Sequence, residues 1–235
     1  MFSTSTILLT GVGAEGQVGE VVASTFAKLG ATLVLVDRRA DKAEARAEGL
    51  VRDGARARGY GCDLSNTAAV AALADAVRRA HGDALHALVH MAGGFAMSGP
   101  VADSTDDVWD RQFTINLKTA YVTARAFLPM LRQGNGSIVF FASPAALPGA
   151  SGARMAAYTA AKSGVVALTK AIAAEEREHG VRANALAPNA IRTATNVAAM
   201  GTEARYVERE QVADAVVYLC SPRASAISGA VVPLE

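Results

Sequence analysis

Cysteine, aromatic residues and excess charge are all scarce in this sequence. Two of the 235 residues are cysteine, 6% are aromatic, and the formal net charge is +1. Cys62 and Cys220 are far apart and lack metal-ligand spacing, so we expect no metal site and a reduced, cytosolic protein. Because both signs of charge are scattered without a basic block, we expect no binding to nucleic acid or to an anionic membrane.

Long apolar runs are missing as well. Residues 1–6 contain no cationic region, and the apolar run behind them is too short for a secretory signal. No segment reaches the roughly 18 consecutive apolar residues that are needed to cross a membrane. These absences favour a cytoplasmic protein that has no membrane partner.

Hydrophobic residues make up 51% of the chain, and many are Ala, Val and Leu, which suits helices packed tightly on a buried sheet. Short apolar runs, which predict strands, alternate with longer segments of helical periodicity. The expected strands are 7–9, 31–36, 55–60, 84–91, 136–142, 181–188 and 227–233, and the expected helices are 18–29, 41–52, 66–80, 104–132, 155–179 and 208–219. This alternation predicts one α/β domain over residues 1–235, with a seven-stranded, doubly wound parallel sheet, helices on both faces, and a ligand site beyond the carboxyl ends of the strands.

Tyr158 and Lys162 are four residues apart in the helix expected at 155–179. This spacing places both side chains on one helix face, where an ammonium beside a phenol favours the phenolate and lowers the phenol pKa. A tyrosine tuned in this way can exchange a proton with an alcohol oxygen near neutral pH. The alternative is an ordinary pair on a helix surface.

A glycine-rich turn follows the first expected strand and opens the first expected helix. Its glycines are Gly11, Gly13, Gly16 and Gly19, and Val18 lies directly before the last of them. Glycines allow the backbone to approach a pyrophosphate, and the helix N-terminus offers free N–H groups to it. The alternative is a glycine-rich turn without a ligand.

Asp37 ends the second expected strand, about 20 residues past the glycines, where a carboxylate can accept hydrogen bonds from the ribose hydroxyls of adenosine. It could instead be the N-cap of helix 41–52. Arg38 and Arg39 follow it, and a guanidinium that turned inward would bind a 2′-phosphate. We weigh Asp37 higher and predict NAD(H) as the cofactor, with NADP(H) disfavoured.

With Ser143 at the end of the apolar run 137–142, these motifs resemble the short-chain dehydrogenase/reductase family over nearly the whole chain. The resemblance implies a Rossmann-type fold and an oxidoreductase in which Tyr158 is the acid/base, Ser143 bonds the substrate oxygen and Lys162 bonds the nicotinamide ribose. It also implies that Asn116 distorts its helix and holds a water in a proton relay. The cofactor contacts that it implies are Gly11, Gly13, Gly16, Val18, Gly19, Asp37, Arg38, Asp63, Leu64, Ala92, Gly93, Tyr158, Lys162, Pro188, Ile191 and Thr193.

The chain departs from the family pattern at four places. The glycine turn is two residues longer, and so is the loop 144–157 before the tyrosine. His90 and Met91 replace a usual pair of asparagines, and Asn189 replaces a usual glycine. We expect His90 to be a packed, hydrogen-bonded histidine rather than a base or a ligand, and residues 194–207 to form a short lid over the substrate.

The predicted function is hydride transfer between NAD(H) and a small secondary alcohol or ketone. The alternatives are a nucleotide-binding relative without catalysis and, less favoured, a lyase-type relative. The family implies a homo-oligomer, a tetramer or a dimer, that pairs helices 104–132 and 155–179. The apolar residues proposed for that interface are Phe127, Leu128, Val165, Val166 and Leu168, whereas Trp109 and Tyr121 are expected to be packing residues.

Overall fold

A computed structural model describes residues 2–235. Its centre is one sheet of seven parallel strands in the order β3-β2-β1-β4-β5-β6-β7, which confirms the doubly wound arrangement. The strands are β1 (Thr6–Thr10), β2 (Thr32–Asp37), β3 (Arg56–Gly61), β4 (Ala87–His90), β5 (Ser137–Phe141), β6 (Arg182–Pro188) and β7 (Val231–Leu234). Strands β2 and β3 extend the sheet on one side of β1, and β4 to β7 extend it on the other side. This change of side leaves a crevice at the carboxyl ends of β1 and β4.

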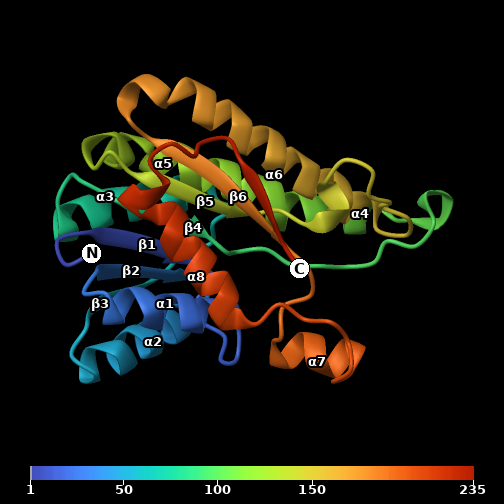
Figure 1. The fold of residues 1–235 in the computed structure, drawn as a ribbon, viewed down its shortest axis with the longest axis horizontal. Helices are drawn as coiled ribbons and strands as arrows, with labels where there is room; N and C mark the ends of the chain where they lie inside the picture. The colour runs from blue at the N-terminus through green and yellow to red at the C-terminus, as the bar shows by residue number, and fades with distance from the viewer. Residues whose placement is uncertain (1) are drawn as a thin grey trace.

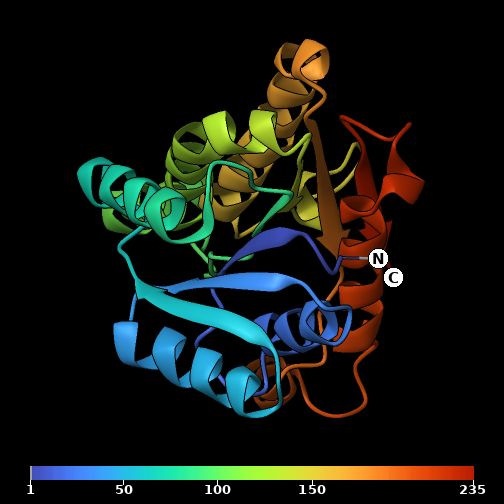
Figure 2. The ribbon, with the colours of Figure 1, turned by 90° about the vertical axis from the view of Figure 1, so that its left-hand side faces the viewer.

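Helices cover both faces of the sheet (Figures 1 and 2). One layer holds α1 (Val18–Lys28), α2 (Ala40–Arg52) and α8 (Arg209–Cys220). The other holds α3 (Thr67–His81), α4 (Asp106–Gln112), the π-helix η2 (Phe113–Lys118), α5 (Thr119–Gln133) and α6 (Ala156–Glu175). Successive residues of a strand pack on opposite faces of the sheet. Leu8 lies in the core under the α3–α5–α6 layer, and Ile7 lies in the core under the α1–α2–α8 layer.

Two predicted segments differ in detail. The helix expected over 104–132 consists of α4, η2 and α5 in direct succession, and Pro129 lies inside α5 rather than at a bend that ends it. The strand expected from residue 84 begins only at Ala87, because Leu85 N–H donates to the carbonyl of Met130 in α5 rather than to a strand. None of the helices within residues 2–235 has the length and apolarity to cross a membrane.

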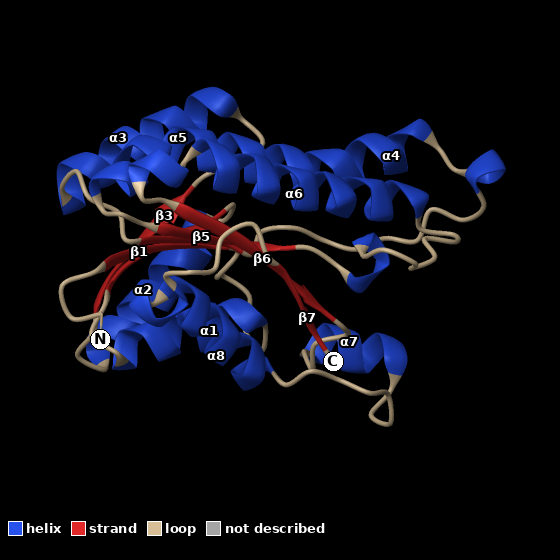
Figure 3. Ribbon diagram, turned by 45° about the horizontal axis from the view of Figure 1, so that its top comes forward, coloured by secondary structure: helices blue, strands red, loops and turns tan. Residues whose placement is uncertain are grey.

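The segment expected as a lid contains a helix of its own, α7 (Ala194–Met200), which stands near the end of β7 (Figure 3). The Thr193 side chain caps it by accepting from Asn196 N–H at 3.2 Å. The Tyr206 hydroxyl closes the other end by donating to the carbonyl of Gly201 at 2.6 Å. Side-chain hydrogen bonds therefore stabilise this short helix, and the periodicity of apolar residues in the sequence does not predict them.

The outer face of α4, η2, α5 and α6 differs in part from the expectation. Trp109 and Tyr121, expected as packing residues, contact neighbouring side chains but are 44% and 46% exposed. Phe127 and Val165 were assigned to a subunit interface, but both are fully buried in the core beneath the helices. The long helices therefore bury part of the proposed interface set against the sheet, whereas Leu168 of the same set lines a hollow on the outer face.

His90, at the end of β4, connects three elements that sequence separates. Its Nδ1 lies 3.3 Å from the Thr10 hydroxyl at the end of β1, and its Nε2 lies 3.2 Å from the Thr119 hydroxyl at the start of α5. Because Thr119 donates to the carbonyl of Ile115, we assign Nε2–H as the donor and Nδ1 as the acceptor from Thr10. This is the packed, hydrogen-bonded histidine that was expected.

Burial lowers the pKa of His90 from 6.5 to about 3, and the Lys162 charge adds to the effect. The unfolded chain binds this proton at a higher pH than the folded protein does. The stabilisation is therefore complete above the unfolded pKa and is lost as the pH falls from about 6.5 toward 3.

We predict that His90→Asn flattens the acid side of the stability profile. Between about pH 7.5 and pH 5 the wild type should lose about 2 kcal/mol more unfolding free energy than the variant. At pH 7.5 the variant itself should be about 1–3 kcal/mol less stable, since a shorter amide cannot keep both threonine bonds. Urea unfolding at each pH measures both numbers, and parallel profiles for the two proteins would contradict the assignment.

Candidate active site

Residues at the ends of five neighbouring strands meet at the carboxyl edge of the sheet. Gly11, Gly93 and Ser143 follow β1, β4 and β5 within three residues, while Asp37 and Pro188 end β2 and β6. Two clefts of about 720 Å³ and 540 Å³ lie along this edge. They share the residues Gly93, Gly94 and Phe95, so they form one continuous groove.

The first cleft contains most of the residues that were predicted to hold the adenosine half of a dinucleotide. Those lining it are Gly11, Asp37, Arg38, Asp63, Leu64, Ala92 and Gly93. Asn66 caps α3 beside it by accepting from the N–H groups of Ala68 and Ala69. The Asp63 side chain accepts from Ser65, which lowers the pKa of its carboxyl.

The glycines of the turn are needed for close contacts. Gly13 N–H donates to Asp37 Oδ2 at 2.9 Å, and a Cβ on Gly13 would stand 2.8 Å from Asp37 Cγ. A Cβ on Gly19 would stand 2.6 Å from the carbonyl oxygen of Gly11, so this glycine lets α1 pack against the end of β1. The Val18 side chain is buried in the core, which leaves only its backbone at the start of α1 for a phosphate.

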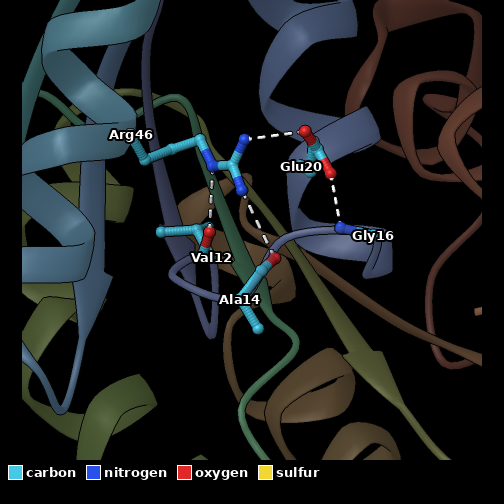
Figure 4. A network of polar contacts seen from close by, with 5 residues as sticks. All are labelled: Val12, Ala14, Gly16, Glu20 and Arg46. Atoms are coloured by element: carbon cyan, nitrogen blue, oxygen red, sulfur yellow. Dashed lines mark hydrogen bonds and ion pairs between the residues drawn. The ribbon is translucent and has the colours of Figure 1, made fainter. Parts of the chain in front are cut away.

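Arg46 of α2 braces the turn from behind (Figure 4). Its guanidinium donates to the carbonyls of Val12 at 3.2 Å and Ala14 at 3.3 Å, and it pairs with Glu20 at 3.0 Å. Glu20 in turn accepts from Gly16 N–H at 2.7 Å. Burial alone would raise the pKa of Glu20, but the bonds from Gly16 and Arg46 outweigh it and lower that pKa. These bonds thus fix the conformation of the glycine turn, which is two residues longer than in the family pattern.

The role of Arg46 was not predicted from the sequence. It lies 34 residues from Val12, and no pattern in its own helix indicates a contact with the glycine turn. The buried side of α2 gives no sign of which exposed or half-buried residue reaches back to the turn. Only the packing of α2 beside α1 makes this contact available.

Asp37, at the end of β2, and the two arginines that follow it make different contacts. Asp37 Oδ1 accepts from Arg39 N–H at 3.1 Å, but α2 begins at Ala40 with Arg39 as its N-cap residue, so Asp37 is not the helix cap. The Arg39 guanidinium pairs with Asp41 at 2.8 Å, and both side chains are more than 60% exposed. Arg38 lines the cleft.

The second cleft brings together the three residues predicted for proton transfer. Ser143, Tyr158 and Lys162 all line it, together with Pro188 and Ile191. Lys162 is 7% exposed, its Nζ donates to the carbonyl of Phe141 at 2.7 Å, and it lies 5.8 Å from the centre of the Tyr158 ring. Burial lowers the pKa of Lys162 to about 8.

The pKa of Tyr158 differs in direction from the sequence expectation. Burial raises it, and the neighbouring Ser143 hydroxyl is what opposes the shift. Lys162 was expected to lower this pKa, but its ammonium bonds to a backbone carbonyl at the end of β5 instead. The i,i+4 spacing correctly placed the two side chains on one helix face, whereas the depth of their burial is a tertiary property.

Asn116 lies in η2, the wide π-helical turn, so the helix is distorted there as the family resemblance implied. Its amide donates to the carbonyl of Gly94 at 3.0 Å and to Gln112, and accepts from Gly94 N–H at 3.1 Å. A Cβ on Gly93 would stand 2.7 Å from Asn116 Oδ1 and 3.6 Å from Lys162 Nζ. Asn116 and Lys162 therefore flank the same glycine.

Several lining residues were not predicted. Phe95, Pro144, Met155, Asn196 and Met200 line the second cleft, and they come from loops or from α7. The double glycine before Phe95 and the length of the loop 144–157 were the available signals, but they do not identify single side chains. Thr193 was predicted as a cofactor contact, and its side chain is the cap of α7.

The groove fits a dinucleotide. It runs from a strand-end carboxylate, past a glycine turn in which a Cβ on Gly11 would stand 2.9 Å from the backbone of Ala92, to a buried lysine and a half-buried tyrosine. Helix α7 borders the turn, since Gln17 Nε2 donates to the Thr195 hydroxyl at 3.1 Å. Within residues 2–235 there is no group of three or more His, Cys, Asp or Glu side chains that could hold a metal ion.

Comparison with known proteins agrees with this geometry. Residues 11–235 match the family model described as Enoyl-(Acyl carrier protein) reductase. The chain is 34% identical to a D-threitol dehydrogenase of Mycolicibacterium smegmatis, over 93% of this chain and 87% of that protein. A solved short-chain type dehydrogenase/reductase from Mycobacterium ulcerans superimposes with a TM-score of 0.89 at 31% identity, over 99% of this chain and 88% of that one.

A solved NAD⁺-bound xylitol dehydrogenase superimposes with a TM-score of 0.88 at 26% identity, over 99% of this chain and 95% of that one. The match thus extends over almost the whole chain in sequence and in fold. The strand-end crevice, the glycine turn and the Ser143, Tyr158 and Lys162 cluster occur together in one protein, and this chain belongs to the short-chain dehydrogenase/reductase family of oxidoreductases.

Proposed function

We propose that this protein transfers a hydride between NAD(H) and a secondary alcohol or ketone. The observation that carries the proposal is the position of Tyr158, with Ser143 beside its phenol and Lys162 one helical turn away, in a cleft continuous with the dinucleotide groove. The relatives' names support an alcohol substrate, since threitol and xylitol are alcohols.

The proposed chemistry divides between the cofactor and the chain. When bound, the nicotinamide supplies or accepts the hydride. Tyr158 gives a proton to the substrate oxygen during reduction and takes it back during oxidation. Ser143 donates a hydrogen bond to the same oxygen and stabilises the charge that develops there. The raised pKa of Tyr158 favours the protonated phenol, which is the form that acts as the acid.

Lys162 and Asn116 support that proton transfer. A lysine with a pKa of about 8 exchanges protons readily near neutral pH, and its Nζ flanks Gly93 together with the Asn116 amide. We assign Lys162 to the nicotinamide ribose and Asn116 to a relay that passes the proton on through water. The two free, buried cysteines suit a reducing compartment such as the cytoplasm.

The preference for NAD(H) rests on Asp37. Its two oxygens each accept one backbone N–H, so the carboxylate keeps acceptor sites for the two ribose hydroxyls. A 2′-phosphate in the same place would meet a negative charge. Arg39 is engaged by Asp41, which leaves Arg38 as the arginine that lines the cleft.

A homo-oligomer, a dimer or a tetramer, belongs to the same proposal. The outer face of α4, η2, α5 and α6 has a hollow lined by Phe113, Leu117, Tyr121 and Leu168. Trp109 stacks on Phe113 at its border, with 4.8 Å between ring centres. Such a face suits an isologous contact with a second copy of the chain.

We predict that Tyr158→Phe lowers kcat by at least about a hundredfold and leaves NADH affinity nearly unchanged, because only the proton donor is lost. Steady-state kinetics and NADH titration measure the two effects, after an alcohol and ketone panel has identified a substrate. Tyr218→Phe, on the exposed side of α8, is the matched control. Activity of Tyr158→Phe within about twofold of wild type would remove Tyr158 from the mechanism.

We predict at least about tenfold tighter binding of NADH than of NADPH. Asp37→Ala should narrow this gap but also release Gly13, whereas Asp37→Asn keeps an acceptor for Gly13 N–H and removes only the charge. The asparagine variant should therefore gain NADPH affinity with a smaller loss of NADH affinity. Fluorescence titration of the three proteins tests this, and equal or tighter NADPH binding by the wild type would refute the role of Asp37.

We predict that the wild type has a mass of two or four times 24.2 kDa in light scattering at micromolar concentration. Leu168→Glu places a charge in the hollow and should shift the mass toward the monomer. Val51→Glu changes an exposed apolar residue on the opposite helix layer and should leave the mass unchanged. A wild-type mass of 24.2 kDa would sink the prediction.

A further inference from the structure

The phenyl ring of Phe95 is placed over the residue proposed for proton transfer. It meets the Tyr158 ring edge-on, with 5.0 Å between ring centres and an interplanar angle of 88°. Phe95 is nevertheless 59% exposed, so it contributes little to the core. A large apolar side chain that is exposed at the mouth of a cleft is available to a ligand.

A pair of backbone bonds fastens the segment that carries this ring. The carbonyl of Arg154 accepts from Ser98 N–H at 2.8 Å and from Gly99 N–H at 3.1 Å, so the Phe95 segment is fastened to the loop before Tyr158. Arg154 has a φ of 63°, which is uncommon for a residue with a side chain. Backbone strain of this kind is maintained where surrounding contacts require it, often at a ligand site.

The side chains around Tyr158 are predominantly apolar. Beside Phe95 they include Met91, Phe141, Pro144, Met155 and Met200, apart from Ile191, which is predicted as a cofactor contact. Methionine adapts its shape easily, so three of them in one cleft suit a bulky apolar ligand.

The polar side chains of the second cleft are few and mostly engaged. Lys162, the one charged residue among its described lining, donates to the carbonyl of Phe141. The Asn196 amide donates to the carbonyl of Ile191 at 2.8 Å, and Asn189 is exposed at the rim. Besides Asn189, the hydroxyls of Ser143 and Tyr158 are left, and both are directed to one substrate oxygen in the proposed chemistry.

A ligand with more polar groups would lose hydrogen bonds in this cleft. A carboxylate, a sulfonate or a second hydroxyl would leave water without a matching side chain, and an unpaired polar group is costly to bury. A polyol has several such hydroxyls, whereas a ring that carries a single carbonyl or hydroxyl has none besides the reacting oxygen.

We infer that the cleft takes an uncharged substrate with one oxygen, at the reacting carbon, and an apolar aromatic or alicyclic body, and that Phe95 is the specificity-determining residue that packs against this body. The inference rests on the proposed function, since it concerns the substrate of that same site. The reaction is the oxidation of a secondary alcohol to a ketone with NAD⁺ as the oxidant, or its reverse.

The kinetic test uses a matched pair of alcohols, 1-phenylethanol and 4-(1-hydroxyethyl)benzenesulfonate, with propan-2-ol and threitol as small and polyhydroxylated probes. The wild type should show a kcat/KM for 1-phenylethanol that is at least about tenfold above those of the sulfonate and of threitol. Phe95→Ala should lower the value for 1-phenylethanol by about tenfold, mainly through KM, and leave propan-2-ol within about twofold. Phe95→Leu should lie between them.

Met97→Ala is the matched control, because Met97 is 54% exposed in the same segment and does not line the second cleft. It should leave all four values within about twofold. A preference for threitol or the sulfonate would overturn the inference while leaving the proposed function intact. An equal loss on all four alcohols in Phe95→Ala would also overturn it, since Phe95 would then position Tyr158 rather than select the substrate.

A binding measurement distinguishes failure of the proposed function from failure of the inference about the substrate. Acetophenone and 4-acetylbenzenesulfonate are titrated by calorimetry into the wild-type protein saturated with NAD⁺, where no turnover can occur. The inference predicts at least about tenfold tighter binding of acetophenone, reduced about tenfold by Phe95→Ala. If no alcohol is oxidised but this binding pattern is seen, the proposed function fails and the ligand class stands. If acetophenone binds no better than its sulfonate, the ligand class fails.

Discussion

The burial of one ammonium group organises the site. Lys162 lies almost completely inside the protein, and its bond to the carbonyl of Phe141 holds α6 against the end of β5. A buried cation is tolerated only where its donors are paired, so the position of Lys162 is strongly constrained. Tyr158 lies one turn earlier on the same helix, and Ser143 follows Phe141 by two residues. The relative placement of the three groups therefore follows from a single contact between helix and strand.

Much of the fold could be predicted because its signals are local. Apolar runs and helical periodicity located all seven strands and most helices, and the glycine turn, Asp37 and Ser143 were expected at strand ends where the structure has them. The predictions failed where a tertiary property decides the outcome. Helix α7 depends on the Thr193 cap and on Tyr206, and the pKa of Tyr158 depends on how deeply α6 is buried.

Two of the four departures from the family pattern are compensated within the structure. His90 stands where an amide is usual, and its two ring nitrogens still connect β1, β4 and the start of α5. The longer glycine turn is held by Arg46 and Glu20 rather than left loose. In both places a change in sequence is matched by a side chain from a distant segment, so the groove keeps its shape. Neither compensation could be read from the changed residue alone.

The bond between Gly13 and Asp37 has a consequence for how this protein can be altered. A single carboxylate accepts from Gly13 N–H in the glycine turn and also lines the first cleft. Under the proposed role of Asp37, loop geometry and coenzyme choice are therefore linked, and only a substitution that keeps an acceptor for Gly13 N–H can change the second without the first. A route to a different coenzyme, in evolution or in the laboratory, has to supply a new anchor for the turn before it gives up the old one.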